Sequence, residues 1–125
     1  MVKNKNALIS VFDKTNLDKI SKFLIKKKYT IYSTGGSSGY LKKIHVPHIQ
    51  VSRYTKQKEI LAGRVKTLHP KIFGGILATN AKDNQEELSR ERIVNFDLLV
   101  VNLYPFEETV KNKKKNWWNN WNDWY

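Results

Sequence analysis

Three side chains within four residues, Arg64, Lys66 and Thr67, form the most distinctive chemical group of the chain, in the stretch GRVKTLHP. Two cations and a hydroxyl at this spacing can surround one anionic group. A lysine whose pKa is lowered by a neighbouring cation such as Arg64 can also donate a proton or stabilise an oxyanion. A solvated basic loop has the same composition, and the spacing alone does not separate the two interpretations.

The stretch STGGSS contains a second group of residues suited to an anion: Thr34, Gly35, Gly36 and Ser37. Glycine lets the backbone approach a ligand closely, and the free amides at the start of a helix favour negative charge. The stretch matches neither the Walker nor the dinucleotide-binding pattern. A tight strand–helix turn capped by serines is therefore the alternative.

Lys14 follows a short apolar run, in ALISVFDKT, and is a candidate cation for a phosphate. Lysine is mostly a solvated surface residue, which is the competing interpretation.

At the other end of the chain, NLYPF places Asn102 and Tyr104 where an apolar run stops. An amide can hydrogen-bond a base or a carboxamide, and a phenol can act as an acid. A packed strand end would have the same residues.

Apolar runs rich in β-branched residues predict the strands that must position these groups. We expect strands at 7–11, 30–33, 48–51 and 98–102, with the run at 97–106, the most apolar of them, in the centre of the sheet. Helices are expected from Thr15, which forms a capping box with Asp18, and from Gly36. Shorter helical segments are expected within 54–61, 69–78 and 85–94.

Strands that alternate with helices favour parallel pairing through right-handed crossovers. The predicted fold class is therefore α/β, a three-layer α/β/α sandwich with a mainly parallel sheet. Ligands of such folds collect at the carboxyl ends of the strands. Because Lys14, the turn at 34–37 and Asn102 each follow a strand, we expect them to meet at one pocket.

The 125-residue chain carries 23 Lys and Arg against 11 Asp and Glu, a net charge of +12. Lysine exceeds arginine and asparagine is frequent, as an AT-rich genome would encode on any solvated surface, so we discount the charge as a sign of nucleic acid. The chain has no cysteine, which argues against disulfides and thiolate metal sites. No apolar run has membrane-spanning length and no signal peptide is evident, so a cytoplasmic protein is expected.

The last 15 residues, KNKKKNWWNNWNDWY, differ in composition from the rest and contain all four tryptophans. We expect residues 1–110 to form one domain and residues 111–125 to be a divergent tail. A run coding for lysine and asparagine is rich in adenine, where reading frames slip, and the favoured interpretation of the tail is a frameshifted or truncated gene.

The motifs ALISVFDKT, STGGSS, GRVKTLHPKIFGGILA and DLLVVNLYPFEETV, in this order, resemble the IMP cyclohydrolase domain of the bifunctional AICAR transformylase/IMP cyclohydrolase family. The resemblance covers about residues 6–110. It implies a methylglyoxal-synthase-like α/β fold and the closure of FAICAR to IMP with loss of water. It implies no metal or other cofactor. The partner would be a purine ribonucleotide, neither nucleic acid nor a membrane is expected, and a homodimer is left open.

The resemblance also suggests a role for each matching residue. Lys66 and Tyr104 resemble the catalytic lysine and tyrosine of the family, and Asn102 resembles a base-side contact. Arg64 and Thr67 resemble the segment that meets the nucleotide. Ligands of the nucleotide phosphate are implied at Ser10, Lys14, Thr34, Gly35, Gly36 and Ser37.

Two departures bear on activity. Phe12 stands where many members carry serine, so a contact there would use the backbone. The family continues into a segment that supplies a catalytic aspartate and a second lysine, where this chain has its tail; we therefore expect impaired turnover. A phosphate- or nucleotide-binding regulatory module of the same fold, without catalysis, is the alternative. Methylglyoxal synthase itself is a third, for which STGGSS lacks the expected aspartate pattern.

Overall fold

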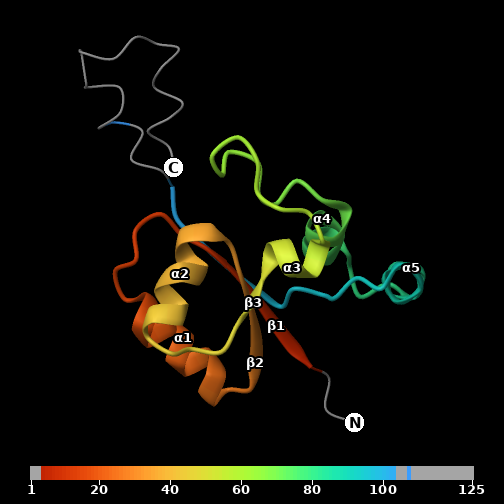
Figure 1. Ribbon diagram of the computed structural model, residues 1–125. Helices are drawn as coiled ribbons and strands as arrows, with labels where there is room; N and C mark the ends of the chain where they lie inside the picture. The colour runs from red at the N-terminus through yellow and green to blue at the C-terminus, as the bar shows by residue number, and fades with distance from the viewer. Residues whose placement is uncertain (1–3, 104–106, 108–125) are drawn as a thin grey trace.

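The computed structural model describes residues 4–103 and residue 107. Strands and helices alternate along most of the described chain (Figure 1). In chain order the elements are β1 (Lys5–Ser10), α1 (Leu17–Lys26), β2 (Tyr29–Ser33), α2 (Gly35–Lys43), β3 (Ile49–Gln50), α3 (Val51–Thr55), α4 (Pro70–Leu77), α5 (Lys82–Glu91) and β4 (Leu98–Val101).

The four strands form one parallel sheet in the order β3-β2-β1-β4. The register places Ile9 opposite Ser33 on one side and Ser10 opposite Val101 on the other. The carboxyl ends of β1, β2 and β4 therefore lie at the same edge of the sheet. The residues that directly follow these strands are brought together, as the sequence predicted.

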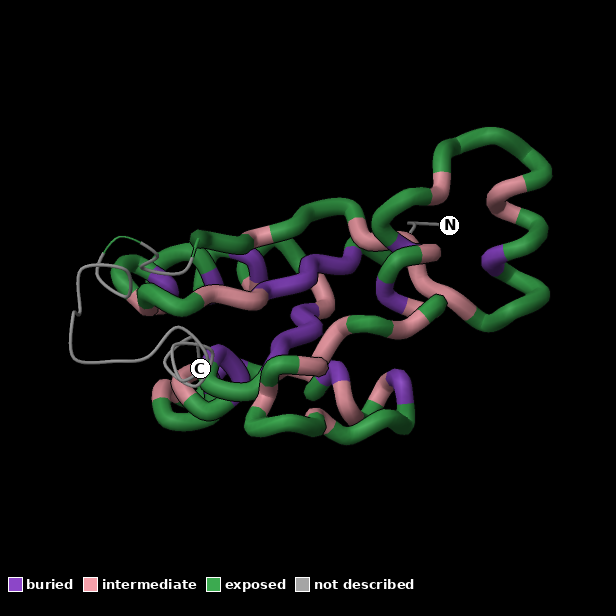
Figure 2. Tube along the Cα trace, turned by 90° about the horizontal axis from the view of Figure 1, so that it is seen from above, coloured by how far each residue is buried: buried purple, intermediate pink, exposed green. Residues whose placement is uncertain are grey.

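Helices cover both faces of the sheet, which confirms the predicted three-layer α/β arrangement (Figure 1). Successive β1 residues point to opposite faces: Ala7 and Ile9 pack with Leu17 and Leu24 of α1, whereas Leu8 packs with Ile72 of α4. The buried residues follow the strands through the middle of the molecule (Figure 2). The apolar run ALIS is thus explained by burial on both sides.

The β4 strand differs from its prediction. It is an edge strand of the described sheet, not a central one, because β1 is its pairing partner on one side and no other described strand pairs with it. Its residues Leu98 and Leu99 are 37% and 44% exposed. Apolar composition alone does not distinguish an edge strand from a central one.

Two local predictions are wrong in detail. The third strand is only two residues long, because Val51 already begins α3. The Thr15–Asp18 capping box is absent: the N-cap of α1 is Asn16, in a left-handed conformation without a side-chain cap bond. Asp13 instead accepts hydrogen bonds from the Thr15 amide (2.9 Å) and hydroxyl (2.6 Å).

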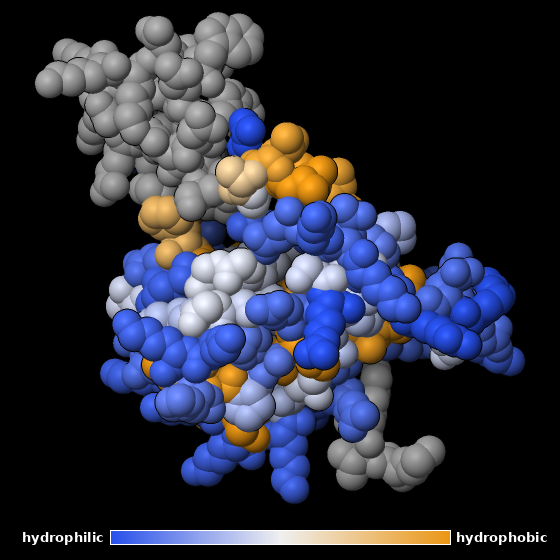
Figure 3. Space-filling model, in the orientation of Figure 1, coloured by the Kyte–Doolittle hydropathy of each residue, from blue (hydrophilic) through white to orange (hydrophobic). Residues whose placement is uncertain are grey.

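The helices at 70–77 and 82–91 confirm the two later helical predictions, whereas the predicted segment at 54–61 contributes only the end of α3. Hydrophilic residues cover most of the face shown in Figure 3, in keeping with the net charge of +12. Within the described residues, no helix combines the length and the apolar character needed to cross a membrane.

Candidate functional site

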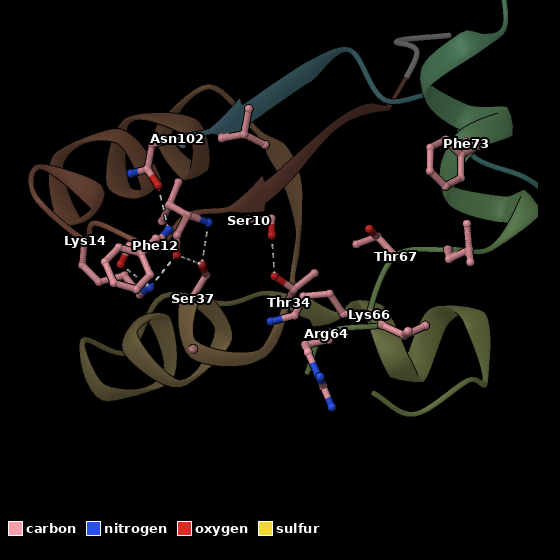
Figure 4. Close-up of a pocket in the computed structure, with 15 residues that line it drawn as sticks. Ser10, Phe12, Lys14, Thr34, Ser37, Arg64, Lys66, Thr67, Phe73 and Asn102 are labelled. Carbon is pink, nitrogen blue, oxygen red and sulfur yellow. Dashed lines mark hydrogen bonds between the residues drawn. The ribbon is translucent and has the colours of Figure 1, made fainter. Parts of the chain in front are cut away.

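A cleft of about 550 Å³ lies at the carboxyl edge of the sheet and brings together most of the predicted site residues. Nine of them line it: Ser10, Lys14, Thr34, Gly36, Ser37, Arg64, Lys66, Thr67 and Asn102. Gly35 does not line it, and Tyr104 lies outside the described residues. Figure 4 shows Lys14, Ser37 and Asn102 at one end of the cleft, Lys66 and Thr67 at the other, and Ser10 and Thr34 between them.

Lys14 is held at the turn after β1 by main-chain oxygens. Its ammonium donates to the carbonyl oxygens of Val11 and Phe12, the latter at 2.9 Å. A Cβ built on Gly36 would lie 3.6 Å from the Lys14 Nζ, so the ammonium sits beside the first turn of α2. Partial burial lowers the pKa of Lys14, and the nearby Lys66 ammonium lowers it further. Two cations therefore share the cleft, an arrangement that a bound anion would stabilise.

Hydroxyl groups join the ends of β1 and β2. The Ser10 and Thr34 hydroxyls lie 2.8 Å apart and share a hydrogen bond. The Ser37 hydroxyl donates to the Val11 carbonyl (3.0 Å) and accepts from the Val11 amide (2.9 Å). Because the Ser37 side chain is committed to the main chain, the group it can offer a ligand is its backbone amide in the first turn of α2.

Asn102 fastens the Lys14 turn to the end of β4. Its side-chain oxygen accepts from the Phe12 and Asp13 amides at 2.7 and 3.3 Å, and its amide nitrogen donates to the Asp13 carbonyl at 2.9 Å. In this structure the Asn102 amide therefore bonds main chain across the cleft edge. The Phe12 backbone takes part through its amide, which donates to Asn102.

Residues 64–67, which we call the basic segment, form the opposite wall of the cleft. Ile60 and Val65 exchange two backbone hydrogen bonds at 3.1 and 3.3 Å, which close a tight turn. Arg64 donates from Nε to the Leu61 carbonyl at 2.9 Å, and its guanidinium points away from Lys14 and Ser37 (Figure 4). Lys66 and Thr67 follow this turn, and their placement depends on it.

Sequence reasoning did not identify several residues at the site. The apolar part of the wall comes from Val11, Phe12, Val65, Leu68, Phe73 and Val101. Glu59 was also missed, although its Oε1 accepts from the Gly35 amide at 2.8 Å. No periodic pattern marks a glutamate whose partner lies 24 residues away. His69 caps the start of α4, where its Nδ1 accepts from the Lys71 amide.

Comparison with known proteins shows where this architecture occurs. The sequence profile of the MGS-like domain matches residues 16–119. The chain is 52% identical over 112 residues to the bifunctional purine biosynthesis protein PurH of Buchnera aphidicola subsp. Acyrthosiphon pisum (strain Tuc7), a match covering 90% of the chain and 21% of that relative. It is 51% identical over 110 residues to PurH of Fusobacterium nucleatum, covering 86% and 21%.

Among solved structures, the crystal structure of ForH aligns with a TM-score of 0.75 and covers 91% of this chain and 62% of that one. At 24% sequence identity this similarity concerns the fold alone. The chain spans about a fifth of the length of the curated relatives it matches.

Proposed function

Because the chain belongs to the family of MGS-like domains, we propose that its cleft binds a purine ribonucleotide and serves the IMP cyclohydrolase step of purine biosynthesis. About half of the matched residues are identical to those of relatives named for purine biosynthesis. The observation that carries the proposal is the position of the Lys14 ammonium beside the first turn of α2, in the same cleft as Lys66 and Thr67.

The phosphate end of the ligand would lie at Lys14 and the α2 turn. Helix N-terminal amides carry partial positive charge and point at an anion. Lys14 adds a full charge, and the hydroxyls of Ser10 and Thr34 lie between the two ends of the cleft. Burial lowers the pKa of Lys14 and repulsion from Lys66 lowers it further, and a phosphate here would relieve that repulsion.

The other end of the cleft, with Lys66 and Thr67, would hold the reacting groups. In FAICAR the carboxamide nitrogen attacks the formyl carbon, and a proton passes from that nitrogen to the formyl oxygen. The resulting hydroxyl leaves as water with the proton of the formamide nitrogen, and the ring C=N bond forms between that nitrogen and the former formyl carbon. Folding the substrate into this geometry supplies much of the rate in an intramolecular reaction. The Lys66 ammonium would stabilise the developing negative charge on the formyl oxygen.

IMP binding, measured by calorimetry at fixed salt, tests the proposal. We expect Lys14→Ala to weaken binding by roughly 1–3 kcal/mol, as for a lost charge-assisted hydrogen bond. Lys82→Ala is the matched control, because it removes the same charge from a position that does not line the cleft. The Lys82 side chain lies on α5 and is 90% exposed. Equal losses for the two variants would mean that the net charge of the chain, not this cleft, attracts the nucleotide.

A second measurement separates turnover from binding. FAICAR cyclisation is followed by absorbance in the unaltered chain and in Lys66→Met, with IMP affinity measured alongside. We expect the substitution to lower the cyclisation rate by more than it lowers affinity, because Lys66 would act on the transition state. IMP binding by a chain that does not cyclise FAICAR would support a binding module without catalysis.

A further inference from the structure

We propose that Glu59 is the residue that positions the basic segment of the cleft, by fastening it to the start of α2. The inference rests on the proposed nucleotide site and adds a positioning residue to it. The contact is specific: Glu59 Oε1 accepts from the Gly35 amide at 2.8 Å. Gly35 has a φ of +25°, and a Cβ there would lie 3.0 and 3.1 Å from the two Glu59 oxygens. A side chain at position 35 would crowd this bond, so glycine allows the carboxylate to reach the amide.

Glu59 directly precedes the turn closed by Ile60 and Val65, which leads into Lys66 and Thr67. The turn is built from its own backbone hydrogen bonds and contributes no residue to the buried core clusters that the described residues form. Its Leu61 side chain is 60% exposed. With little apolar packing to fix its place, the turn depends on polar contacts at its base. The Glu59–Gly35 bond is such a contact.

The second oxygen of Glu59 faces the basic segment. A Cβ built on Gly63 would lie 3.5 Å from Glu59 Oε2 and 3.3 Å from Lys66 Nζ. The carboxylate and the ammonium therefore both lie on the side of Gly63 where glycine has no side chain, and their opposite charges attract each other. Lys66 in turn acts electrostatically on Lys14. Glu59 thus links the α2 turn to the lysine at the reactive end of the cleft.

Glu59 acts from outside the cleft. It lines a separate polar pocket of about 260 Å³ together with Ser33, Gly35, Gln50 and Ser52. Gly36 and Ser37, not Gly35, line the cleft itself. Glu59 therefore occupies an amide of the turn that faces away from the candidate ligand site and leaves Gly36 and Ser37 to that site. This location distinguishes a positioning residue from one that competes with the ligand.

The two roles predict opposite effects on IMP affinity. If Glu59 positions the segment, Glu59→Ala weakens IMP binding roughly tenfold, as for one lost charge-assisted bond. Glu59→Gln keeps an acceptor oxygen, so it should weaken IMP binding by no more than about half as much as Glu59→Ala on the logarithmic scale. If Glu59 competes with the phosphate, both variants bind IMP more tightly than the unaltered chain, which would overturn the proposal. Glu86→Ala, a carboxylate removed from exposed α5, is the control for net charge.

A double-mutant cycle tests whether the effect passes through the basic segment. In a Lys66→Met background, Glu59→Ala should weaken IMP binding less than it does alone, because the group it positions is already gone. Equal losses in both backgrounds would contradict positioning of Lys66.

Amide hydrogen exchange in the ligand-free chain gives a readout that does not depend on the proposed function. We expect faster exchange at residues 60–67 and at Gly35 in Glu59→Ala, a smaller change in Glu59→Gln, and none in Glu86→Ala. Unchanged exchange at these amides would overturn the proposal even if IMP affinity fell. If the unaltered chain does not bind IMP, the proposed function fails, while the exchange measurement still decides whether Glu59 holds the segment.

Discussion

At the scale of single residues, the surroundings of the Lys14 ammonium bear most directly on how the cleft would bind an anion. Two main-chain carbonyls orient its ammonium, and burial together with Lys66 lowers its pKa. A lysine in this state loses its proton at a lower pH than an ordinary lysine. A bound phosphate would favour the charged form and raise the pKa again.

This difference predicts how affinity depends on pH. At a pH between the pKa of Lys14 in the free chain and its higher pKa in the complex, binding takes up a proton. Affinity therefore falls as the pH rises above the pKa of Lys14 in the free chain. That value lies below the ordinary 10.5. We expect the dissociation constant for ribose 5-phosphate, whose phosphate is already doubly ionised at about pH 8, to rise from about pH 8 to about pH 10. In Lys14→Arg the curve should be flatter, since arginine keeps its charge; curves of the same slope would contradict the assignment.

At the scale of elements, the close approach of α4 to the chain before β4 explains one glycine of the Gly74–Gly75 pair. A Cβ on Gly75 would lie 2.4 Å from the Val94 carbonyl oxygen and 2.8 Å from the Phe96 ring. The Gly75 carbonyl also accepts from the Phe96 amide at 2.9 Å. Helix α4 can therefore pack against this segment only where a side chain is absent.

We expect Gly75→Ala to lower the free energy of unfolding by roughly 1–3 kcal/mol, because the backbone of Val94 must shift to admit the methyl group. Gly39→Ala is the matched control, since it lies within α2 and its Cβ would meet nothing within 4 Å. There the substitution should be neutral or stabilise by about 0.5–1 kcal/mol through helix propensity. Urea unfolding of both variants gives the two free energies of unfolding. Equal values would show that the segment packed against α4 shifts without cost to admit the methyl group.

The elements also show what the sequence could predict. β1 and β2 were predictable because runs such as ALISV contain β-branched residues and have no helical period. The edge position of β4 was not, because Leu98 and Leu99 have the same composition whether a strand is central or at the edge. Val51 could extend a strand or begin a helix, and tertiary packing decided for the helix. Glu59 gave no signal, since its partner amide is set by the fold.

At the scale of the whole molecule, the net charge of +12 complicates any binding measurement. A chain of this charge attracts anions over its entire surface, and the attraction weakens with salt. Affinity alone therefore does not distinguish a nucleotide in the cleft from one held loosely by surface lysines. The position of the ligand does, and the fold predicts that position. The parallel strands bring Lys14 and the α2 turn to one edge of the sheet, and the turn closed by Ile60 and Val65 places Thr67 in the same cleft.

The most direct test of this account is a titration of the isotope-labelled chain with IMP, followed by amide chemical shifts at moderate salt. The account predicts saturable shifts that are largest at Lys14, Gly36, Ser37 and Thr67, around the cleft at the carboxyl ends of β1, β2 and β4. Shifts concentrated in the groove between α4 and α5, lined by Lys71 and Glu87, would contradict it. So would weak shifts spread over the exposed lysines that vanish as salt is raised.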